Sequence, residues 1–295
     1  MPSSKPIIGF IGLGIMGRPM AMNLIKGGYR LAVYARRPQV TKPLAGAGAD
    51  VYQSPASLAQ HTDVVFTMVS DTPDVKQVIL GEHGIAYGAR HGNIVVDMST
   101  ISPAVTRDIA QELAARGVEM LDAPVSGGEQ GAIDGNLSIM VGGKSEIFAR
   151  VRPLFECMGK NIVHVGDHGA GQVAKACNQI LVAQIIAAVG EALVLARAAG
   201  ADPVRVREAL LGGFAYSKIL EVHGLRVLEG NYKPGFKAQL HQKDMHIALQ
   251  TAHQHGMALP GAERTAQYLD ELVGQGDGEL DSAAIATVVE RLARG

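Results

Sequence analysis

The sequence predicts an α/β protein in which a doubly wound parallel sheet forms the first half and helices alone form the second. Short apolar runs typical of buried strands alternate with helical segments from residue 7 to residue 141. A glycine-rich turn follows the first of these runs, and one long apolar segment of helical pattern leads out of the alternating half. We therefore expect two domains, residues 1–167 and 168–295, joined by a long interdomain helix.

The composition is that of a globular protein and bounds its partners. With 295 residues, 47% of them hydrophobic and 19% charged, the chain can bury the cores of two ordinary domains. The net charge of -1 gives no basic excess for nucleic acid or an anionic membrane. Cys157 and Cys177 lack the spacing of a metal site, and the first residues lack a secretion signal, so we expect a cytoplasmic protein without a metal.

The first predicted strand, Ile7–Ile11, runs directly into a GxGxxG pattern, and a helical segment follows it. The pattern is formed by Gly12, Leu13, Gly14, Ile15, Met16 and Gly17. In this context the first glycine permits a tight turn, the second lets the backbone approach a pyrophosphate, and the third lets helix and strand pack closely. A Rossmann domain that binds a dinucleotide is the favoured interpretation, and a glycine-rich turn without a ligand is the alternative.

The residues after the second predicted strand, Leu31–Tyr34, bear on which dinucleotide binds. An NAD-binding domain usually has an acidic residue here for the ribose hydroxyl groups, but this chain has Ala35, Arg36 and Arg37. Arginine matches the geometry of a phosphate group, so the pair favours the 2′-phosphate of NADP(H). If both arginines are simply solvated, NAD(H) is the alternative.

Further predicted strands continue the alternation: Asp50–Tyr52, Asp63–Val69 and Asn93–Met98. Parallel strands end at the same edge of their sheet, so the turns that follow them lie where ligands bind. This places Val69, Ser70 and Thr100 beside the expected cofactor. A turn or helix-capping role is the alternative for Thr100.

A glycine-rich loop follows the next predicted strand, which begins at Glu119. Ser126, Gly127 and Gly128 offer a hydroxyl group and unobstructed backbone N–H groups, which suit a small carboxylate. A plain loop explains the glycines equally well. The alternating half ends with another predicted strand, Leu137–Val141.

The segment from Gly166 to Gly200 predicts one helix of roughly 30 residues, about 45 Å long. Lys175 and Asn178 lie three residues apart in it, so both side chains emerge on one face about a turn apart. A membrane span is disfavoured, because Lys175 and Glu191 put charges into the apolar run. Apolar residues on almost all sides favour a helix buried between other elements.

Only helical patterns follow Gly200. Asp202-Pro203 predicts a helix start, Gly212-Gly213 a break, residues 231–235 a loop and Leu240–Ala252 a helix, and the last segment from residue 281 is also helical. The histidines of this half lack the spacing of metal ligands, so we expect them to be packed or solvated.

Four stretches together resemble the β-hydroxyacid dehydrogenase family, over essentially the whole chain. They are Phe10–Asn23, Asp122–Gly128, Gly169–Asn178 and Lys243-Asp244. In that order they are similar to the family's N-terminal signature, its substrate loop, its catalytic segment and its C-terminal cofactor and substrate motif. Asn178-Gln179 and residues 134–143 and 233–244 are most similar to the tartronate semialdehyde reductases of this family.

The resemblance implies an NAD(P)-dependent oxidoreductase that interconverts a small hydroxyacid and its semialdehyde. It implies that Lys175 is the catalytic acid and base and that Asn178 holds the substrate. The loop Ser126–Gly128 is implied in the same way as part of the substrate site. The remaining implied contacts are Val69, Ser70, Thr100 and Lys243 for the cofactor and Thr100, Phe236 and Asp244 for the substrate.

Two departures and several alternatives accompany the resemblance. Ser70 stands where the family usually has proline, which bears on a contact beside the nicotinamide, and Ala35 replaces a residue that is often Asp or Asn, which argues against a preference for NAD. 3-Hydroxyisobutyrate dehydrogenase and succinic semialdehyde or glyoxylate reductase are alternative activities that need only a changed pocket. A non-catalytic module that senses the dinucleotide is a remote alternative, which Lys175 argues against. We also expect a homodimer or homotetramer, because the apolar long helix needs covering.

Overall fold

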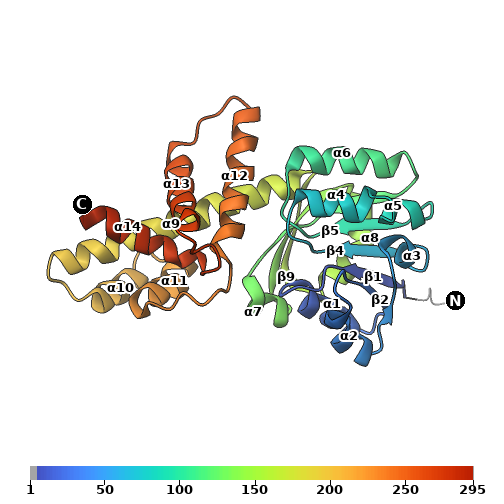
Figure 1. Cartoon of the computed structure of the whole chain (residues 1–295), viewed down its shortest axis with the longest axis horizontal. Helices are drawn as coiled ribbons and strands as arrows, with labels where there is room; N and C mark the ends of the chain where they lie inside the picture. The colour runs from blue at the N-terminus through green and yellow to red at the C-terminus, as the bar shows by residue number, and fades with distance from the viewer. Residues whose placement is uncertain (1–4, 295) are drawn as a thin grey trace. The chain divides into compact units, whose positions relative to one another are not determined.

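The computed structural model describes residues 5–294 and shows an α/β part followed by helices, as the sequence predicts (Figure 1). The chain forms two compact units, here called the first and the second unit, and the boundary between them falls between Lys175 and Ala176. Their junction lies inside the long helix α9 (Ala170–Ala198). The boundary expected between residues 167 and 168 stays a prediction for the functional domains.

Parallel strands form the main part of the sheet in the first unit. Their order across the sheet is β3 (Asp50–Val51), β2 (Leu31–Tyr34), β1 (Ile8–Ile11), β4 (Val64–Thr67), β5 (Ile94–Asp97) and β6 (Glu119–Asp122). Ile8 of β1 pairs with Leu31 on one side and with Val64 on the other, so the chain order reverses at β1. In a doubly wound sheet, ligands bind at the carboxyl ends of the strands beside this reversal.

Beyond β6 the sheet continues with antiparallel pairing. β8 (Leu137–Gly143) pairs antiparallel with β6 and with the short strand β7 (Val125–Ser126). β9 (Gly159–Gly166) pairs parallel with β8 and leads into α9. The sequence predicts strands at β6 and β8 and a loop where the structure has the short strand β7. β9 and the preceding helix α8 (Ser145–Phe155) were not predicted.

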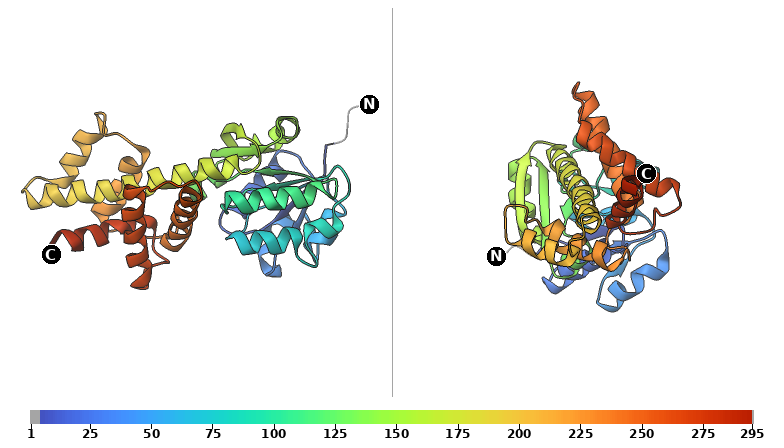
Figure 2. Two further views of the ribbon diagram at one scale, coloured as in Figure 1. Left: turned by 90° about the horizontal axis from the view of Figure 1, so that it is seen from above. Right: turned by 90° about the vertical axis from the view of Figure 1, so that its left-hand side faces the viewer.

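Helices cover both faces of the sheet (Figure 1). One face packs against α1 (Gly17–Lys26), α2 (Lys42–Gly46), α7 (Gly128–Ile133) and α8. The other packs against α3 (Pro55–Ala59), α4 (Thr72–Leu80), α5 (Ile85–Gly88) and α6 (Pro103–Ala114). A short 3-10 helix, η1 (Pro38–Thr41), follows β2. Figure 2 shows α4 and α6 side by side on their face, where the two helices are in contact.

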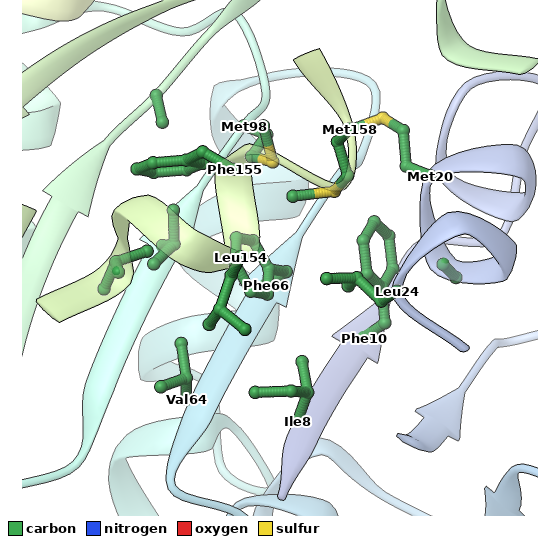
Figure 3. Close-up of a cluster of buried hydrophobic side chains, with 14 of the residues drawn as sticks. Ile8, Phe10, Met20, Leu24, Val64, Phe66, Met98, Leu154, Phe155 and Met158 are labelled. Atoms are coloured by element: carbon green, nitrogen blue, oxygen red, sulfur yellow. The ribbon is translucent and has the colours of Figure 1, made fainter. Parts of the chain in front are cut away.

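Aromatic and sulfur-containing side chains fill the core beneath α1 and α8 (Figure 3). The Phe66 ring stacks on Phe10 with ring centres 6.0 Å apart and meets Phe155 edge-on at 6.1 Å. Met20 and Leu24 of α1 lie against the same cluster and are fully buried. Burial of a side chain of this size stabilises the fold by about 1.5–3 kcal/mol, so this cluster fixes the end of β1 and the start of α1, between which the glycine pattern lies.

α9 runs without interruption for 29 residues, as the sequence predicts. By length and composition it would also pass for a membrane span, since an 18-residue window has a mean hydropathy of 2.0. However, Gln172, Lys175 and Gln179 are almost completely buried in the protein. Buried polar side chains on such a helix are typical of a core helix whose polar groups find partners in the fold.

The second unit is a helical bundle around the remainder of α9. Its other elements are α10 (Pro203–Leu211), α11 (Lys218–Glu229), α12 (Ala238–Gln254), α13 (Pro260–Gly274), η2 (Ser282–Ala284) and α14 (Ile285–Arg294). Ile186 of α9 shares a buried cluster with Met245 of α12, Leu269 of α13 and Val288 of α14. Asp202 caps α10 by accepting a hydrogen bond from the Val204 N–H at 2.9 Å, as its position before a proline predicts.

Candidate active site

The predicted cofactor residues of the first unit gather at the carboxyl edge of the sheet. The backbone N–H of Met68, just beyond β4, donates to the Ile11 carbonyl at 2.9 Å, and the Met98 N–H donates to Thr67 at 2.8 Å. The ends of β1, β4 and β5 are therefore adjacent in space. Consequently the structure brings the turns that carry Gly12, Val69, Ser70 and Thr100 to one edge.

The glycine pattern has the shape that a pyrophosphate needs. Gly12 has a φ of +95°, and a Cβ there would overlap the Met68 carbonyl group. A Cβ on Gly17 would likewise overlap the Gly12 carbonyl group, whereas a Cβ on Gly14 would meet nothing within 4 Å. The first turn of α1 has no acidic residue, and Met16 provides no side-chain cap. The open backbone at Gly14 and the uncapped helix N-terminus together fit the diphosphate of a dinucleotide.

The two arginines after β2 differ in their surroundings. A guanidinium nitrogen of Arg36 lies 3.2 Å from a carboxylate oxygen of Asp74, which is in the first turn of α4. Arg37 immediately precedes η1 and is exposed. Both guanidinium groups thus belong to the turn that follows β2, and Asp74 forms an ion pair with one of them.

A buried carboxylate at the end of β5 connects the turns after β4 and β5. Asp97 Oδ1 accepts hydrogen bonds from the Thr67 hydroxyl group at 2.7 Å and from the Ser99 N–H at 3.2 Å. The Ser99 hydroxyl oxygen in turn accepts from the Val69 N–H at 3.0 Å. Complete burial raises the pKa of Asp97 to about 6, against the opposing effect of these hydrogen bonds. This network holds in place Val69 and Ser99, the residue that precedes Thr100.

A second buried carboxylate, at the end of β6, holds the start of α9. Asp122 Oδ1 accepts from the Gly169 N–H at 2.8 Å, and Oδ2 accepts from the Gln172 N–H at 3.0 Å. Burial raises the pKa of the Asp122 carboxyl, and the two N–H groups oppose that rise. Gly171 has no room for a side chain, because a Cβ would overlap the Met140 carbonyl group and lie 2.8 Å from both the backbone carbonyl oxygen and Oδ2 of Asp122.

The side chain of Gln172 completes this anchor. Its amide nitrogen donates to the Ser99 carbonyl at 2.8 Å, and its amide oxygen accepts from the Ile101 N–H at 3.1 Å. The first turn of α9 is thereby attached to the turn after β5, which carries Thr100. Lys175 follows one turn later and is only 7% exposed, and Asn178 lies one turn further on and is half-buried. A buried lysine and an amide therefore lie on one face of an anchored helix.

The predicted substrate loop has an unusual backbone. Gly127 has a φ of +139° and Gly128 a φ of +63°, both in the region that favours glycine. A Cβ on Gly128 would meet nothing within 4 Å, so the space beside this residue is open. Ser126 is half-buried at the end of β7, where it pairs with Ser138 of β8. The loop thus presents a hydroxyl group and accessible backbone.

In the second unit, a chain of polar contacts connects α9 with α12. The Asn178 amide nitrogen donates to the Gln179 amide oxygen at 2.7 Å, and the Gln179 amide nitrogen donates to Asp244 Oδ2 at 2.7 Å. The ammonium group of Lys243 lies 2.9 Å from Asp244 Oδ1. Gln179 and Asp244 are 2% and 3% exposed, so these contacts are largely shielded from water. The structure therefore brings together Asn178, Lys243 and Asp244, which the sequence resemblance names separately.

Phe236 lies in a loop that another buried carboxylate organises. Asp281 Oδ2 accepts from the backbone N–H groups of Gly235 at 2.8 Å and of Phe236 at 3.0 Å. Burial alone would raise the pKa of Asp281, but the contact with His223 and these hydrogen bonds outweigh that effect and lower it. The Phe236 ring lies 5.4 Å from the ring of His241, whose Nε2 is 3.3 Å from the Gln179 carbonyl oxygen.

The sequence-based prediction assigns no role to several residues of this arrangement, although some of them lie inside its motifs: Asp97, Asp122, Gln172, Gln179 and Asp281. Their polar atoms act through other residues and have no spacing pattern of their own. Asp97 and Asp122 do share one signal, since each is an acidic residue at the end of an apolar strand. An acid in that position is costly to bury and therefore marks a group with specific partners.

Comparisons with known proteins agree with this geometry. A family model described as the NAD binding domain of 6-phosphogluconate dehydrogenase matches residues 7–166. A second, described as the NAD-binding region of NADP-dependent 3-hydroxyisobutyrate dehydrogenase, matches residues 169–289. The 2-hydroxy-3-oxopropionate reductase of Escherichia coli strain K12 is 48% identical over 286 residues, which cover 97% of this chain and 98% of the relative. The chain belongs to the β-hydroxyacid dehydrogenase family.

Other members of the β-hydroxyacid dehydrogenase family match over a similar length. The 3-hydroxyisobutyrate dehydrogenase of Pseudomonas aeruginosa is 38% identical over 296 residues, covering 98% of both chains. The solved structure of the Mycobacterium tuberculosis 3-hydroxyisobutyrate dehydrogenase with L-serine has a TM-score of 0.89 and 30% identity, and covers 96% of this chain and 99% of that one. The chain is thus an NAD(P)-dependent oxidoreductase with the fold of this family, and the glycine loop of the first unit belongs to its nicotinamide dinucleotide domain.

Proposed function

We propose that this β-hydroxyacid dehydrogenase reduces tartronate semialdehyde (2-hydroxy-3-oxopropanoate) to glycerate with NADPH. The observation that carries the proposal is the pair Lys175 and Asn178, a buried lysine and an amide three residues apart on an α9 that Asp122 anchors. The similarity of the whole chain to the 2-hydroxy-3-oxopropionate reductase of Escherichia coli supports the choice of substrate.

The proposed reaction adds a hydride and a proton across the aldehyde group. A bound nicotinamide supplies the hydride to the aldehyde carbon. Lys175, as the ammonium ion, donates a proton to the carbonyl oxygen as negative charge develops on it, and the side chain becomes the neutral amine. Asn178 donates a hydrogen bond that orients the substrate. Lysine suits the proton transfer because it has three donors on a flexible stem and can change its protonation state when it is partly desolvated.

The carboxylate of the substrate requires a separate set of contacts. We propose that the Ser126 hydroxyl group and the backbone N–H groups of Gly127 and Gly128 bind it, because this loop combines a donor side chain with open backbone. By the family resemblance, Thr100, Phe236 and Asp244 are proposed to contact the substrate as well. Val69, Ser70, Thr100 and Lys243 are proposed to contact the cofactor.

We propose a preference for NADPH over NADH. Arg36 and Arg37 follow β2, and the acidic residue that would bind free ribose hydroxyl groups is missing there. A ribose phosphate would have to compete with Asp74 for Arg36, so Arg37 is the better candidate for the stronger contact. We also propose a cytoplasmic enzyme that acts as a homodimer or homotetramer, since Leu181 and Leu195 of α9 are 61% and 69% exposed in the single chain.

The test of the proposed function is a comparison of initial rates. Oxidation of NADPH and of NADH is followed with tartronate semialdehyde, succinic semialdehyde and methylmalonate semialdehyde. The proposal expects the highest kcat/KM for tartronate semialdehyde with NADPH. A clear preference for methylmalonate semialdehyde would instead assign the 3-hydroxyisobutyrate dehydrogenase reaction, which the name of the Pseudomonas aeruginosa relative also suggests. Tight NADPH binding without turnover of any of the three aldehydes would contradict the proposed function.

A further inference from the structure

We propose that Asp281 is a positioning residue for the reaction: together with Arg226, it holds residues 231–237 in the conformation that presents the Phe236 side chain to the substrate. These residues, here called the Phe236 loop, connect α11 with α12. The inference rests on the substrate contact proposed above for Phe236. Asp281 acts through the loop and is not itself proposed to touch the substrate.

One oxygen atom of Asp281 fixes the backbone at Phe236. Asp281 Oδ2 accepts hydrogen bonds from the N–H groups of Gly235 at 2.8 Å and of Phe236 at 3.0 Å. Two consecutive N–H groups that point at one acceptor fix the peptide unit between them. The next peptide unit is fixed as well, because the Phe236 carbonyl oxygen accepts from the Ser282 N–H at 2.9 Å. The direction in which the Phe236 side chain leaves the backbone is thereby determined.

Arg226 of α11 holds the other side of the Phe236 loop. Its Nη1 donates to the Lys233 carbonyl oxygen at 2.7 Å and lies 3.4 Å from Asp281 Oδ2. A Cβ on Gly235 would lie only 3.2 Å from Nη2 of Arg226 and 3.4 Å from Asp281 Oδ2. The glycine therefore lets both charged groups approach the backbone of the loop closely.

Burial and charge make these contacts firm. Asp281 is 1% exposed, and its other oxygen accepts from the Ala283 N–H at 3.0 Å and lies 3.5 Å from His223 Nδ1. Burial alone would raise the pKa of Asp281, but the contact with His223 and the backbone hydrogen bonds outweigh that effect and lower it. The carboxylate therefore stays ionised at neutral pH. A buried charge is costly to separate from its partners, so the loop is held to one arrangement.

The surroundings of the Phe236 ring connect the loop to the part of α9 that carries Asn178. The ring centre lies 5.4 Å from that of His241, and His241 Nε2 lies 3.3 Å from the carbonyl oxygen of Gln179, the residue after Asn178. A shift of the loop would therefore move an aromatic ring next to this segment. Substrate binding would be affected before the bound cofactor is.

Asp281→Asn tests the inference, because asparagine keeps the size of the side chain, removes the charge and replaces one acceptor by a donor. We expect the KM for the semialdehyde that the wild type reduces best to rise about tenfold, while kcat changes by less than about threefold, since a displaced ring weakens substrate binding. NADPH affinity is expected to stay at the wild-type value. Asp202→Asn is the matched control, because Asp202 is an exposed aspartate that likewise precedes a helix of the second unit and accepts from Val204. It should keep the wild-type KM.

A double-mutant cycle separates positioning from a general structural effect. If Asp281 acts through the Phe236 side chain, then adding Asp281→Asn to Phe236→Ala should change KM by less than about twofold. An equal rise of KM in both backgrounds would show that Asp281 acts in another way, and would overturn the inference.

Arg226→Met provides a second variant should Asp281→Asn not fold. It removes the hydrogen bond to the Lys233 carbonyl, while Asp281 keeps the N–H groups of Gly235, Phe236 and Ala283. The same rise of KM and the same outcome of the cycle with Phe236→Ala are expected. An Arg226→Met variant with the wild-type KM would overturn the inference.

The wild-type rate is measured first, so that the two proposals fail separately. A wild type that reduces none of the three aldehydes contradicts the proposed function, and the inference with it. An active wild type whose Phe236→Ala or Asp281→Asn variant keeps the wild-type KM contradicts the inference alone.

Discussion

Asp122 and Gln172 are joined by a hydrogen bond from the backbone N–H of Gln172 to Asp122 Oδ2, 3.0 Å long and fully buried. The other oxygen of the same carboxylate accepts from Gly169. A negative charge at a helix N-terminus is favourable, since it meets the unpaired N–H groups and the positive end of the helix dipole. The end of β6 thus determines where α9 begins, and so where Lys175 lies along it.

Asp122→Asn is expected to lower both stability and turnover. The substituted amide keeps one acceptor but turns a donor toward the second N–H, so the free energy of unfolding should fall by about 1–3 kcal/mol. Because the first turn of α9 shifts with it, kcat should fall as well. Asp167→Asn is the control, an exposed aspartate just before α9, expected to change stability by less than about 0.5 kcal/mol. Chemical denaturation measures the unfolding free energies, and initial rates measure kcat. Equal stability of the two variants would contradict the role of Asp122 in holding the start of α9.

Two glycines of the GxGxxG pattern should respond differently to alanine. Gly12→Ala is expected to destabilise the fold by more than about 1 kcal/mol, because its φ is +95° and the methyl group would overlap the Met68 carbonyl. Gly14→Ala should leave the unfolding free energy nearly unchanged, since its Cβ position is open, but should weaken NADPH binding by filling the space of the pyrophosphate. Thermal unfolding without cofactor and fluorescence titration with NADPH measure the two effects. Unweakened NADPH binding by the Gly14 variant would show that the open space does not hold the pyrophosphate.

The arginine after β2 offers a test of cofactor preference. Arg37→Ala should raise the KM for NADPH about tenfold or more and leave that for NADH unchanged, because only NADPH has the phosphate that a guanidinium group binds. Arg30→Ala is a suitable control, since Arg30 is exposed and precedes β2 at its other end. Equal KM changes for both cofactors would mean that Arg37 does not recognise the phosphate.

Asp97 predicts a pH-dependent contribution to stability. Burial raises its pKa to about 6 in the folded protein, above its ordinary value in an unfolded chain. Between these two values the folded state binds more protons, so this group makes the protein less stable as the pH rises. Asp97→Asn removes the titration. As the pH rises from 4 to 7, the free energy of unfolding of the wild type should therefore fall relative to that of the variant. Denaturant unfolding of both proteins at both pH values measures this change. A pH-independent difference would contradict the raised pKa.

Much of the fold follows from local patterns. The GxGxxG turn appears between a strand and a helix as predicted, and α9 spans Ala170–Ala198 within the expected segment. Local signals were weaker for α8, where Pro153 stands inside the helix, a position typical of a helix end. β9 alternates exposed and half-buried residues along much of its length at the edge of the sheet, so little burial marks it as a strand.

The candidate site was predictable only where a residue belongs to a motif. Lys175 and Asn178 share a helix face, and their spacing alone shows that. The partner of Gln179 could not be found in this way, because Asp244 lies 65 residues further along the chain and only the packing of α12 against α9 brings it near. The same holds for Gln172 and Ser99, which are 73 residues apart. Long-range pairs of this kind depend on tertiary packing and leave no periodic trace.

The central claim is that the Lys175 ammonium group protonates the substrate, and Lys175→Met tests it most directly. Methionine keeps the length of the buried stem and removes the charge. We expect kcat for tartronate semialdehyde to fall by about 10²- to 10⁴-fold, while the affinity for NADPH, measured by fluorescence titration, stays near that of the wild type. Lys160→Met, at an exposed position of β9, should behave like the wild type in both measurements. Full turnover by Lys175→Met would contradict the account, and normal folding with lost turnover and retained NADPH binding is the result that it predicts.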